Sequence, residues 1–379
     1  MTFPVPKYSR SQVNNAGEYL RTIHTTVESI DFTKYRWAYE VLSNWRVSHS
    51  YPINTFNSTL RKKLKRVDPD TLVAQRLKRT PSILHKLERF PKMQLSRMQD
   101  IGGLRAIVGS VKELSAIHKI YKTSRFSHEL VSEYDYVLNP KPSGYRSIHL
   151  VYRYKNLKQK AYDGIQIELQ FRTQIQHIWA TAVETVGTFL DQSLKSSEGS
   201  DDWLKFFALA GSAFSYLEGL KPVPGYEHLD RLETFKATVK EAERLDIRNT
   251  LLGYSSALKS IPKGTASSAY YLVELDLTGE QKKVSIQSFN RDSLQIASEE
   301  YAKAEERATV GDAIQVVLVS AGSIQSLKLA YPNYFLDTHG FLAQLKRIER
   351  LSNQSESSRD AHDRLMKKKE VIAKAKLSK

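Results

Sequence analysis

The 379-residue sequence contains no cysteine. Without thiols the chain can form neither a disulfide framework nor a cysteine-ligated zinc site. Long hydrophobic runs are absent as well, since no apolar stretch approaches the roughly 20 residues that a membrane-spanning helix needs. Residues 1–6 also lack the apolar core of a signal peptide. We therefore expect a soluble, cytoplasmic protein with no membrane partner.

Acidic residues are scarce relative to basic ones. Asp and Glu number 41 against 57 Lys and Arg, which gives a formal net charge of +16. Such a balance is typical of proteins with a polyanionic partner, and both RNA and nucleotide polyphosphates fit that description. The basic residues concentrate at positions 61–66, 76–79 and 367–376.

A short basic segment carries four side-chain donors, namely Arg76, Lys78, Ser82 and Lys86. Residues 81–90 are predicted to form a helix, which places Ser82 and Lys86 one turn apart on one face. Helix N-termini attract anions, because their first backbone amides lack partners. On its own the cluster is typical of a solvated helix face, and it predicts a polyphosphate site only together with the features below.

Two carboxylates accompany predicted strands. Residues 103–108 form a short, partly apolar run, and residues 164–172 alternate apolar with polar side chains. Asp100 stands at the entrance of the first strand, and Glu168 lies on the polar face of the second. Carboxylates from two strands suit a hard cation such as Mg²⁺, which bridges to substrate phosphates.

Tyr145 follows a turn-prone stretch at residues 139–144 and precedes a strand predicted at residues 148–154. An aromatic ring at the lip of a strand can stack a nucleobase. The chain has 20 tyrosines, so packing is the commoner role for any single one of them.

The order and spacing of these blocks resemble the RelA/SpoT nucleotide pyrophosphokinase (alarmone synthetase) domain. The likeness covers residues 35–220 and is greater to the small single-domain synthetases, or a related toxin branch, than to the long bifunctional enzymes. It implies an α+β fold in which a mixed β-sheet of nucleotidyltransferase type is flanked by helices. The matching blocks are Arg76-x-Lys78-x3-Ser82-x3-Lys86, Asp100 to Arg105, Asp135-Tyr136, Gly144 to His149, Glu168 to Thr173, and His177 to Ala180 with Glu184.

The resemblance implies a Mg²⁺-dependent transferase of the GTP diphosphokinase type. The β,γ-pyrophosphate of ATP would move to the ribose 3′-hydroxyl of GDP or GTP, giving (p)ppGpp alarmones of the stringent response and releasing AMP. Asp100 would bind the metal, Glu168 would share it or accept the 3′-hydroxyl proton, and Tyr145 would stack the acceptor base. The other implied residues are Arg76, Lys78, Ser82, Lys86 and Arg105 at ATP, and His149, Gln170 and Arg172 at the acceptor.

One position departs from the family pattern. Small synthetases usually carry a basic residue immediately before the Asp-Tyr of the tyrosine block, whereas here Glu133 and Tyr134 precede Asp135. A cation for the 5′-phosphates of the acceptor is therefore missing. This favours an acceptor whose phosphates are held differently, as in the toxin branch, which pyrophosphorylates the 3′ end of tRNA and blocks translation.

The rest of the chain is predicted to surround this unit. Residues 1–225 form the synthetase domain with an N-terminal helical brace, residues 226–351 a helical linker and a small α+β domain, and residues 352–379 a basic tail. The second domain shows no phosphate loop, metal spacing or nucleophile, so regulation or partner binding is assigned to it by elimination. The expected helices are 11–30, 32–47, 53–66, 229–260, 292–307 and 338–351, and the expected strands of the second domain are 268–277, 282–289 and 313–319.

Three functions stay open from the sequence. The first is an enzyme that makes guanosine alarmones or an adenosine analogue, the second a tRNA-modifying toxin regulated by its own C-terminal domain, and the third a catalytically silent RNA-binding module. Fewer than 80 residues precede Arg76, so we expect no alarmone hydrolysis, and we regard the His362-Asp363 pair as coincidental. Related small synthetases are often oligomeric, which leaves a homo-oligomer open.

Overall fold

The computed structural model describes residues 3–23, 31–190, 201–256, 270–276, 283–290, 293–308, 314–320 and 338–354. The chain divides into two compact units, which are described separately. Unit 1 takes residues 1–137, 146–177 and 256–337, and unit 2 takes residues 138–145, 178–255 and 338–379. No helix in the described ranges is both long and apolar enough to cross a membrane.

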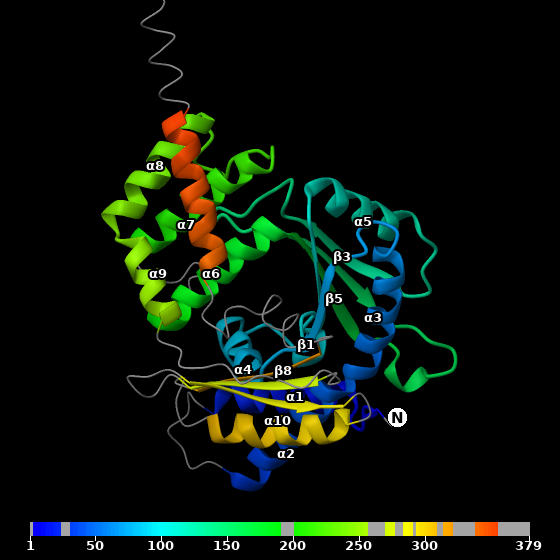
Figure 1. The fold of residues 1–379 in the computed structure, drawn as a ribbon. Helices are drawn as coiled ribbons and strands as arrows, with labels where there is room; N and C mark the ends of the chain where they lie inside the picture. The colour runs from blue at the N-terminus through cyan, green and yellow to red at the C-terminus, as the bar shows by residue number, and fades with distance from the viewer. Residues whose placement is uncertain are drawn as a thin grey trace, which may run out of the picture. The chain divides into compact units, whose positions relative to one another are not determined.

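Unit 1 is built on a mixed sheet, which has eight strands among the described residues (Figure 1). Its β2 and β5 run parallel, and every other pairing is antiparallel. The strands in spatial order are β3 (Glu129–Asp135), β4 (Ile148–Arg153), β5 (Gln166–Thr173), β2 (Gly102–Val108), β1 (Leu72–Leu77), β8 (Ile314–Ser320), β6 (Tyr270–Asp276) and β7 (Lys283–Phe289).

One face of this sheet, here called the back face, is covered by helices. In β5 the back face carries Ile167, Leu169 and Phe171, all fully buried, and the ring of Tyr121 in α5 (Val111–Thr123) lies 5.4 Å from that of Phe171. Gly102 gives α3 (Ser50–Leu64) room to approach, because a Cβ there would lie 2.8 Å from Ile53 Cδ1. The alternate residues of the strands point to the opposite, front face, where the polar side chains lie.

Further helices complete unit 1. They are α1 (Arg10–Thr22), α2 (Phe32–Ser48), α4 (Thr80–Arg89) and α10 (Leu294–Ala308), with short 3-10 turns at Leu95–Arg97 and Lys160–Tyr162. A core of buried residues joins α10 to β6 and β8, and it includes Tyr301, Leu272 and Leu318. Helix α10 therefore packs on strands that continue the sheet begun by β1 to β5.

Unit 2 is helical. It contains most of α6 (Gln174–Leu190), then α7 (Asp201–Leu217), α8 (Arg231–Arg244), α9 (Ile247–Ser256) and a helix over residues 339–354. The ring of Phe341 in the final helix lies 5.2 Å from that of Phe214 in α7, and Thr338 donates a 3.0 Å hydrogen bond to Leu251 O in α9. Gly144, with φ +94°, packs so closely on α7 that a Cβ at Gly211 would lie 2.9 Å from its Cα.

The predicted α+β class with a mixed, helix-flanked sheet is confirmed, but the C-terminal organisation differs from the prediction. The hairpin of β6 and β7, helix α10 and strand β8 all exist, yet they join the synthetase sheet instead of forming a second domain, because β8 pairs with β1. The predicted helix 229–260 is broken at Asp246, whose φ is +48°. The His362-Asp363 pair and the basic tail beyond residue 354 lie outside the described residues.

Candidate active site

Arg76, Gly103 and Glu168 stand in one row on the front face of the sheet. Arg76 in β1 pairs with Gly103 in β2, and Gly103 pairs with Glu168 in β5. Directly paired residues project to the same side of a sheet, so the cation and the carboxylate flank a position that has no side chain. The row therefore has a basic side chain on one side of the glycine and an acidic side chain on the other.

Asp100 lies immediately before β2 and is held by two lysines. Lys78 Nζ is 2.9 Å from Asp100 Oδ2, and Lys86 Nζ is 2.8 Å from Asp100 Oδ1. Burial alone would raise the pKa of the Asp100 carboxyl, but the two ammonium groups hold it well below its usual range. Helix α4 brings Ser82 to the same face as Lys86, one turn earlier. The cationic segment predicted from the sequence is thus assembled around a carboxylate.

Glu168 is mostly buried and is hydrogen-bonded on both oxygens. Its Oε1 lies 2.7 Å from His149 Nδ1, and its Oε2 accepts a 2.6 Å hydrogen bond from Gln170 Nε2. Burial opposes ionisation, but the hydrogen bond and charge of His149 keep the pKa of Glu168 below its ordinary value, while the nearby charge of Asp100 acts in the opposite sense. Glu168 is therefore ionised at neutral pH and oriented by His149.

A second row on the front face lies beside the first. Arg105 in β2 pairs with Gln170 in β5, Gln170 pairs with His149 in β4, and His149 pairs with Tyr134 in β3. Arg105 is buried, and the fully buried Arg172 donates a 3.3 Å hydrogen bond to Gln170 Oε1. The structure thus places the predicted strand residues on the front face and joins Lys78 and Lys86 to Asp100; the strand residues are Arg76, Arg105, His149, Glu168, Gln170 and Arg172.

Two tyrosines extend this surface beyond His149. The rings of Tyr134 and Tyr136 are stacked nearly parallel, at 3° with centroids 5.8 Å apart. Tyr136 also meets the His149 ring edge to face, with centroids 5.5 Å apart. Glu133, by contrast, points to the back face, where its Oε1 lies 2.8 Å from His118 Nε2 on α5. The position that carries a basic residue in many small synthetases is therefore occupied by an exposed aromatic ring.

Tyr145 belongs to unit 2 and is described within that unit. Its side chain is only 7% exposed. The ring contacts Trp179, with centroids 6.5 Å apart, and Lys141 Nζ lies 5.4 Å from its centre. These contacts describe a packed ring, and the predicted stacking role for Tyr145 stays a prediction.

Two carboxylates are available for a metal ion. In the described part of the chain, no group of three or more His, Asp or Glu side chains gathers as a metal site. Asp100 and Glu168 are close enough to influence each other's charge. Two hard oxygen ligands, with water and phosphate oxygens completing the shell, are the donor set that Mg²⁺ accepts at nucleotide sites.

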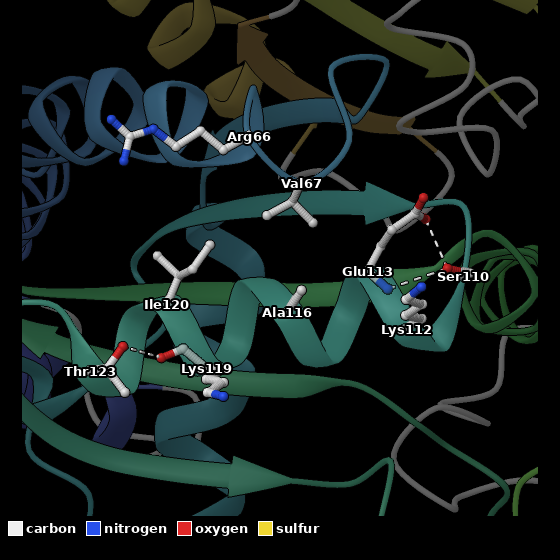
Figure 2. Close-up of a pocket in the computed structure, with 9 residues that line it drawn as sticks. All are labelled: Arg66, Val67, Ser110, Lys112, Glu113, Ala116, Lys119, Ile120 and Thr123. Carbon is white, nitrogen blue, oxygen red and sulfur yellow. Dashed lines mark hydrogen bonds between the residues drawn. The ribbon is translucent and has the colours of Figure 1, made fainter.

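A separate cavity of about 560 Å³ lies along α5, the helix that covers the back face of the sheet (Figure 2). It contains none of the predicted site residues. Arg66, Lys112 and Lys119 give its rim a positive charge, and Glu113 is bonded to Ser110 at the start of α5. The lining residues are Arg66, Val67, Ser110, Lys112, Glu113, Ala116, Lys119, Ile120 and Thr123.

Sequence reasoning missed the residues that support the site from behind. Arg46 in α2 donates a 2.6 Å hydrogen bond from Nε to Lys78 O, and Glu305 in α10 accepts a 2.7 Å bond from Thr80 N. No local pattern marks these two residues, because their partners lie 32 and 225 positions away in the chain. The signal available in the sequence for the stacked rings is their spacing, since Tyr134 in β3 and Tyr136 one residue beyond it are two positions apart.

The motif region is similar to known proteins. Residues 75–187 match the family described as "Region found in RelA / SpoT proteins". GTP pyrophosphokinase YjbM of Bacillus subtilis is 34% identical over 115 residues, which cover 30% of this chain and 54% of that protein. The GTP pyrophosphokinase of Haemophilus influenzae is 33% identical over 145 residues, covering 38% of this chain and 18% of that protein. The chain thus spans about half the length of the first relative and less of the second.

A solved structure gives a similar match. Small alarmone synthetase 1 from Bacillus subtilis, in the crystal structure bound to its product pppGpp, aligns with a TM-score of 0.40 and 26% identity. The alignment covers 45% of this chain and 89% of that one.

Proposed function

We propose that the protein, whose residues 75–187 match the region found in RelA / SpoT proteins, transfers pyrophosphate from ATP to the ribose 3′-hydroxyl of a guanosine nucleotide. The observation that carries the proposal is the front-face row in which Arg76 and Glu168 flank Gly103, with Asp100 held by two lysines at its edge. ATP and guanosine nucleotides are cytoplasmic metabolites, so the reaction would take place in the cytoplasm.

The cationic side would bind ATP. Lys78 and Lys86 bring two ammonium groups to one point, and Arg76 and Arg105 add guanidinium groups that suit phosphate or a stacked base. Ser82 adds a hydroxyl donor on the same face of α4 as Lys86. Positioning and charge neutralisation are the main needs of phosphoryl-type transfer, and no protein nucleophile is required.

A divalent metal fits the site. Asp100 would hold it through carboxylate oxygens, and Glu168 would either share it or act as the base; we propose Mg²⁺ because the donors are hard oxygens. When bound, Mg²⁺ supplies positive charge that offsets the charge developing on the phosphate oxygens. Lys78 and Lys86 would then turn from Asp100 to the phosphates, which their flexible side chains allow.

The transfer itself forms one bond and breaks one. The acceptor 3′-oxygen bonds to the β-phosphorus of ATP, the bond from that phosphorus to the α,β-bridging oxygen breaks, and AMP leaves with that oxygen. In the alternative in which Glu168 is the base, it would accept the 3′-hydroxyl proton, which its lowered pKa and its contact with His149 support. His149, Gln170 and Arg172 would shape the acceptor side of the site, and we keep Tyr145 as the proposed stacking residue for the acceptor base.

A separate observation favours a second candidate function. Tyr134, whose ring is stacked on Tyr136, stands where a cation for acceptor phosphates is expected, and aromatic rings suit unpaired bases better than phosphates. This favours an acceptor with several exposed bases, such as the 3′ end of tRNA, over a free nucleotide. In that case the same chemistry would block translation.

The test is transfer of label from ATP carrying ³²P at the γ-position, with GDP, GTP, ATP and total tRNA offered in parallel in the presence of Mg²⁺. Label in a guanosine nucleotide supports the first proposal, and label in tRNA supports the second. The Asp100→Ala variant serves as the control and should transfer none. If no acceptor becomes labelled, both candidates are contradicted.

A further inference from the structure

A buried ion pair lies behind the phosphate-handling segment. Arg46 in α2 and Glu305 in α10 are each 3% exposed, with Arg46 Nη1 at 4.0 Å from Glu305 Oε2. The Arg46 guanidinium lies 4.1 Å from the centre of the Tyr301 ring, whose hydroxyl donates a hydrogen bond to Glu305 Oε1. Charges this deeply buried are costly unless they are paired.

The pair holds the backbone of residues 78–80. Arg46 Nε donates to Lys78 O at 2.6 Å, and Glu305 Oε1 accepts from Thr80 N at 2.7 Å. The other side of this backbone is fixed as well, because Lys78 N donates to Ile101 O at 2.7 Å. The Lys78 peptide is thus fixed on both sides, with its ammonium group on Asp100.

Glu305 also takes the place of a helix cap. Arg79, the residue before α4, makes no side-chain capping bond, and the first amide of the helix is satisfied by Glu305 instead. A carboxylate at this end is favoured by the helix dipole. Helix α4 carries Ser82 and Lys86, so its direction decides where both side chains point.

The same C-terminal segment reaches the site by a second route. Strand β8 pairs with β1, matching Ser320 to Gln75 and Val319 to Arg76. The segment of residues 270–320 therefore contacts the backbone at Arg76 through a strand and at Thr80 through Glu305. The two contacts lie on either side of Lys78.

We propose that Arg46 and Glu305 are positioning residues for ATP, and that the C-terminal segment which supplies Glu305 is part of the ATP site. This inference rests on the proposed function. The pair acts by fixing the backbone of Lys78 and Thr80. This backbone determines the direction in which the side chains of Lys78 and Lys86 point. A buried ion pair is weak evidence for a gain in stability, and Arg46 Nη2 has no hydrogen-bond partner among the described residues. Arg46 and Glu305 also form hydrogen bonds with the backbone of Lys78 and Thr80, and an apolar pair could not form these bonds.

The test compares three variants with the full-length wild type. Glu305→Gln removes the charge, Arg46→Met/Glu305→Leu replaces the pair by apolar side chains of similar size, and Glu299→Gln is the control on an exposed position of the same helix. Binding of a non-hydrolysable ATP analogue with Mg²⁺ is measured by calorimetry, the KM values for ATP and acceptor by transfer, and the unfolding temperature by fluorescence.

We expect Glu305→Gln to weaken analogue binding about tenfold and to raise the KM for ATP, with the acceptor KM changed less than about twofold. The double variant should unfold near the wild-type temperature and still show the ATP defect, which a merely structural role would not produce. Glu299→Gln should behave as the wild type.

The proposal is overturned if folded Glu305→Gln binds the analogue as tightly as the wild type, or if the apolar double variant binds it normally. A wild type that binds the analogue but labels no acceptor contradicts the proposed function and leaves the positioning comparison intact. A wild type that does not bind the analogue contradicts both.

Discussion

The ammonium nitrogen of Lys78 lies 2.9 Å from Oδ2 of Asp100, with only 18% and 24% of the two side chains exposed. Lys86 approaches the other oxygen of the same carboxylate. Burial lowers the pKa of Lys78, and the charge of Asp100 opposes that shift. Asp100 therefore has a structural task as well as its proposed metal-binding one.

We expect Asp100→Asn to destabilise the protein at neutral pH by about 2 kcal/mol, because two partly buried lysines lose their shared counter-charge. The folded-state pKa of Asp100 is depressed, so its stabilisation is present above the unfolded-state pKa of about 3.9. It shrinks as the pH falls past that value and is lost as the pH falls through the folded-state pKa. Urea unfolding of both proteins between pH 7 and pH 3 measures this, and a difference that grows toward acid pH would contradict it.

Glu168→Gln should abolish the proton transfer and leave ATP binding largely intact. The amide keeps the shape of the side chain but cannot accept the proton, so we expect kcat to fall by about 100-fold or more. Transfer assays and analogue binding on the same preparation separate the two effects. The control is Glu129→Gln, which removes an exposed carboxylate from β3 in the same sheet. Equal loss in both variants would argue against a specific role for Glu168.

Tyr134 offers a test of acceptor preference. Tyr134→Lys places a cation at the position where the family pattern has one, next to Tyr136 and His149. If tRNA is the acceptor, the variant should label it several-fold less, because a base–aromatic stack contributes about 1 to 3 kcal/mol. Free GDP or GTP should be labelled more in the variant than in the wild type. An unchanged ratio between the two acceptors would show that Tyr134 does not select between them.

Unit 2 has a packing constraint that can be tested without any assay of activity. Gly211→Ala would place a Cβ 2.9 Å from Gly144 Cα, and we expect a loss of about 2 kcal/mol in unfolding free energy. Gly219→Asn is the matched control, because Gly219 has φ +68°, which Asn tolerates, and a Cβ there would meet nothing within 4 Å. Denaturant unfolding measures the unfolding free energy of both variants. A similar loss in Gly219→Asn and Gly211→Ala would contradict the argument.

The motif blocks could be predicted from the sequence because their charged and polar residues stand at fixed short spacings along the chain. Ser82 and Lys86 share a helix face, and alternation in residues 164–172 put Glu168 and Gln170 on the polar side of a strand, as the structure has them. The resemblance to RelA/SpoT proteins, which residues 75–187 carry, and the α+β class are confirmed.

Long-range pairing was not readable in the same way. The hairpin β6–β7 and strand β8 were predicted as elements, but whether β8 pairs with β1 or stays within its own domain depends on contacts about 240 positions apart, as Arg76 with Val319 shows. Strand β1 does not follow from the sequence pattern, because three consecutive residues, Val73 to Gln75, are buried and the alternation typical of a half-buried strand is absent. Strand β3 was missed because it shows no alternation of buried and exposed residues: its apolar Leu130 and Tyr134 are exposed, and none of its residues is fully buried.

The most direct test of the account is the fate of the two ends of ATP. With ATP labelled at the α-position in one reaction and at the γ-position in another, the wild type should release the α-label as AMP and place the γ-label on the acceptor in equal amounts. Recovery of the α-label as ADP, with a single phosphate on the acceptor, would contradict pyrophosphate transfer and with it the central proposal.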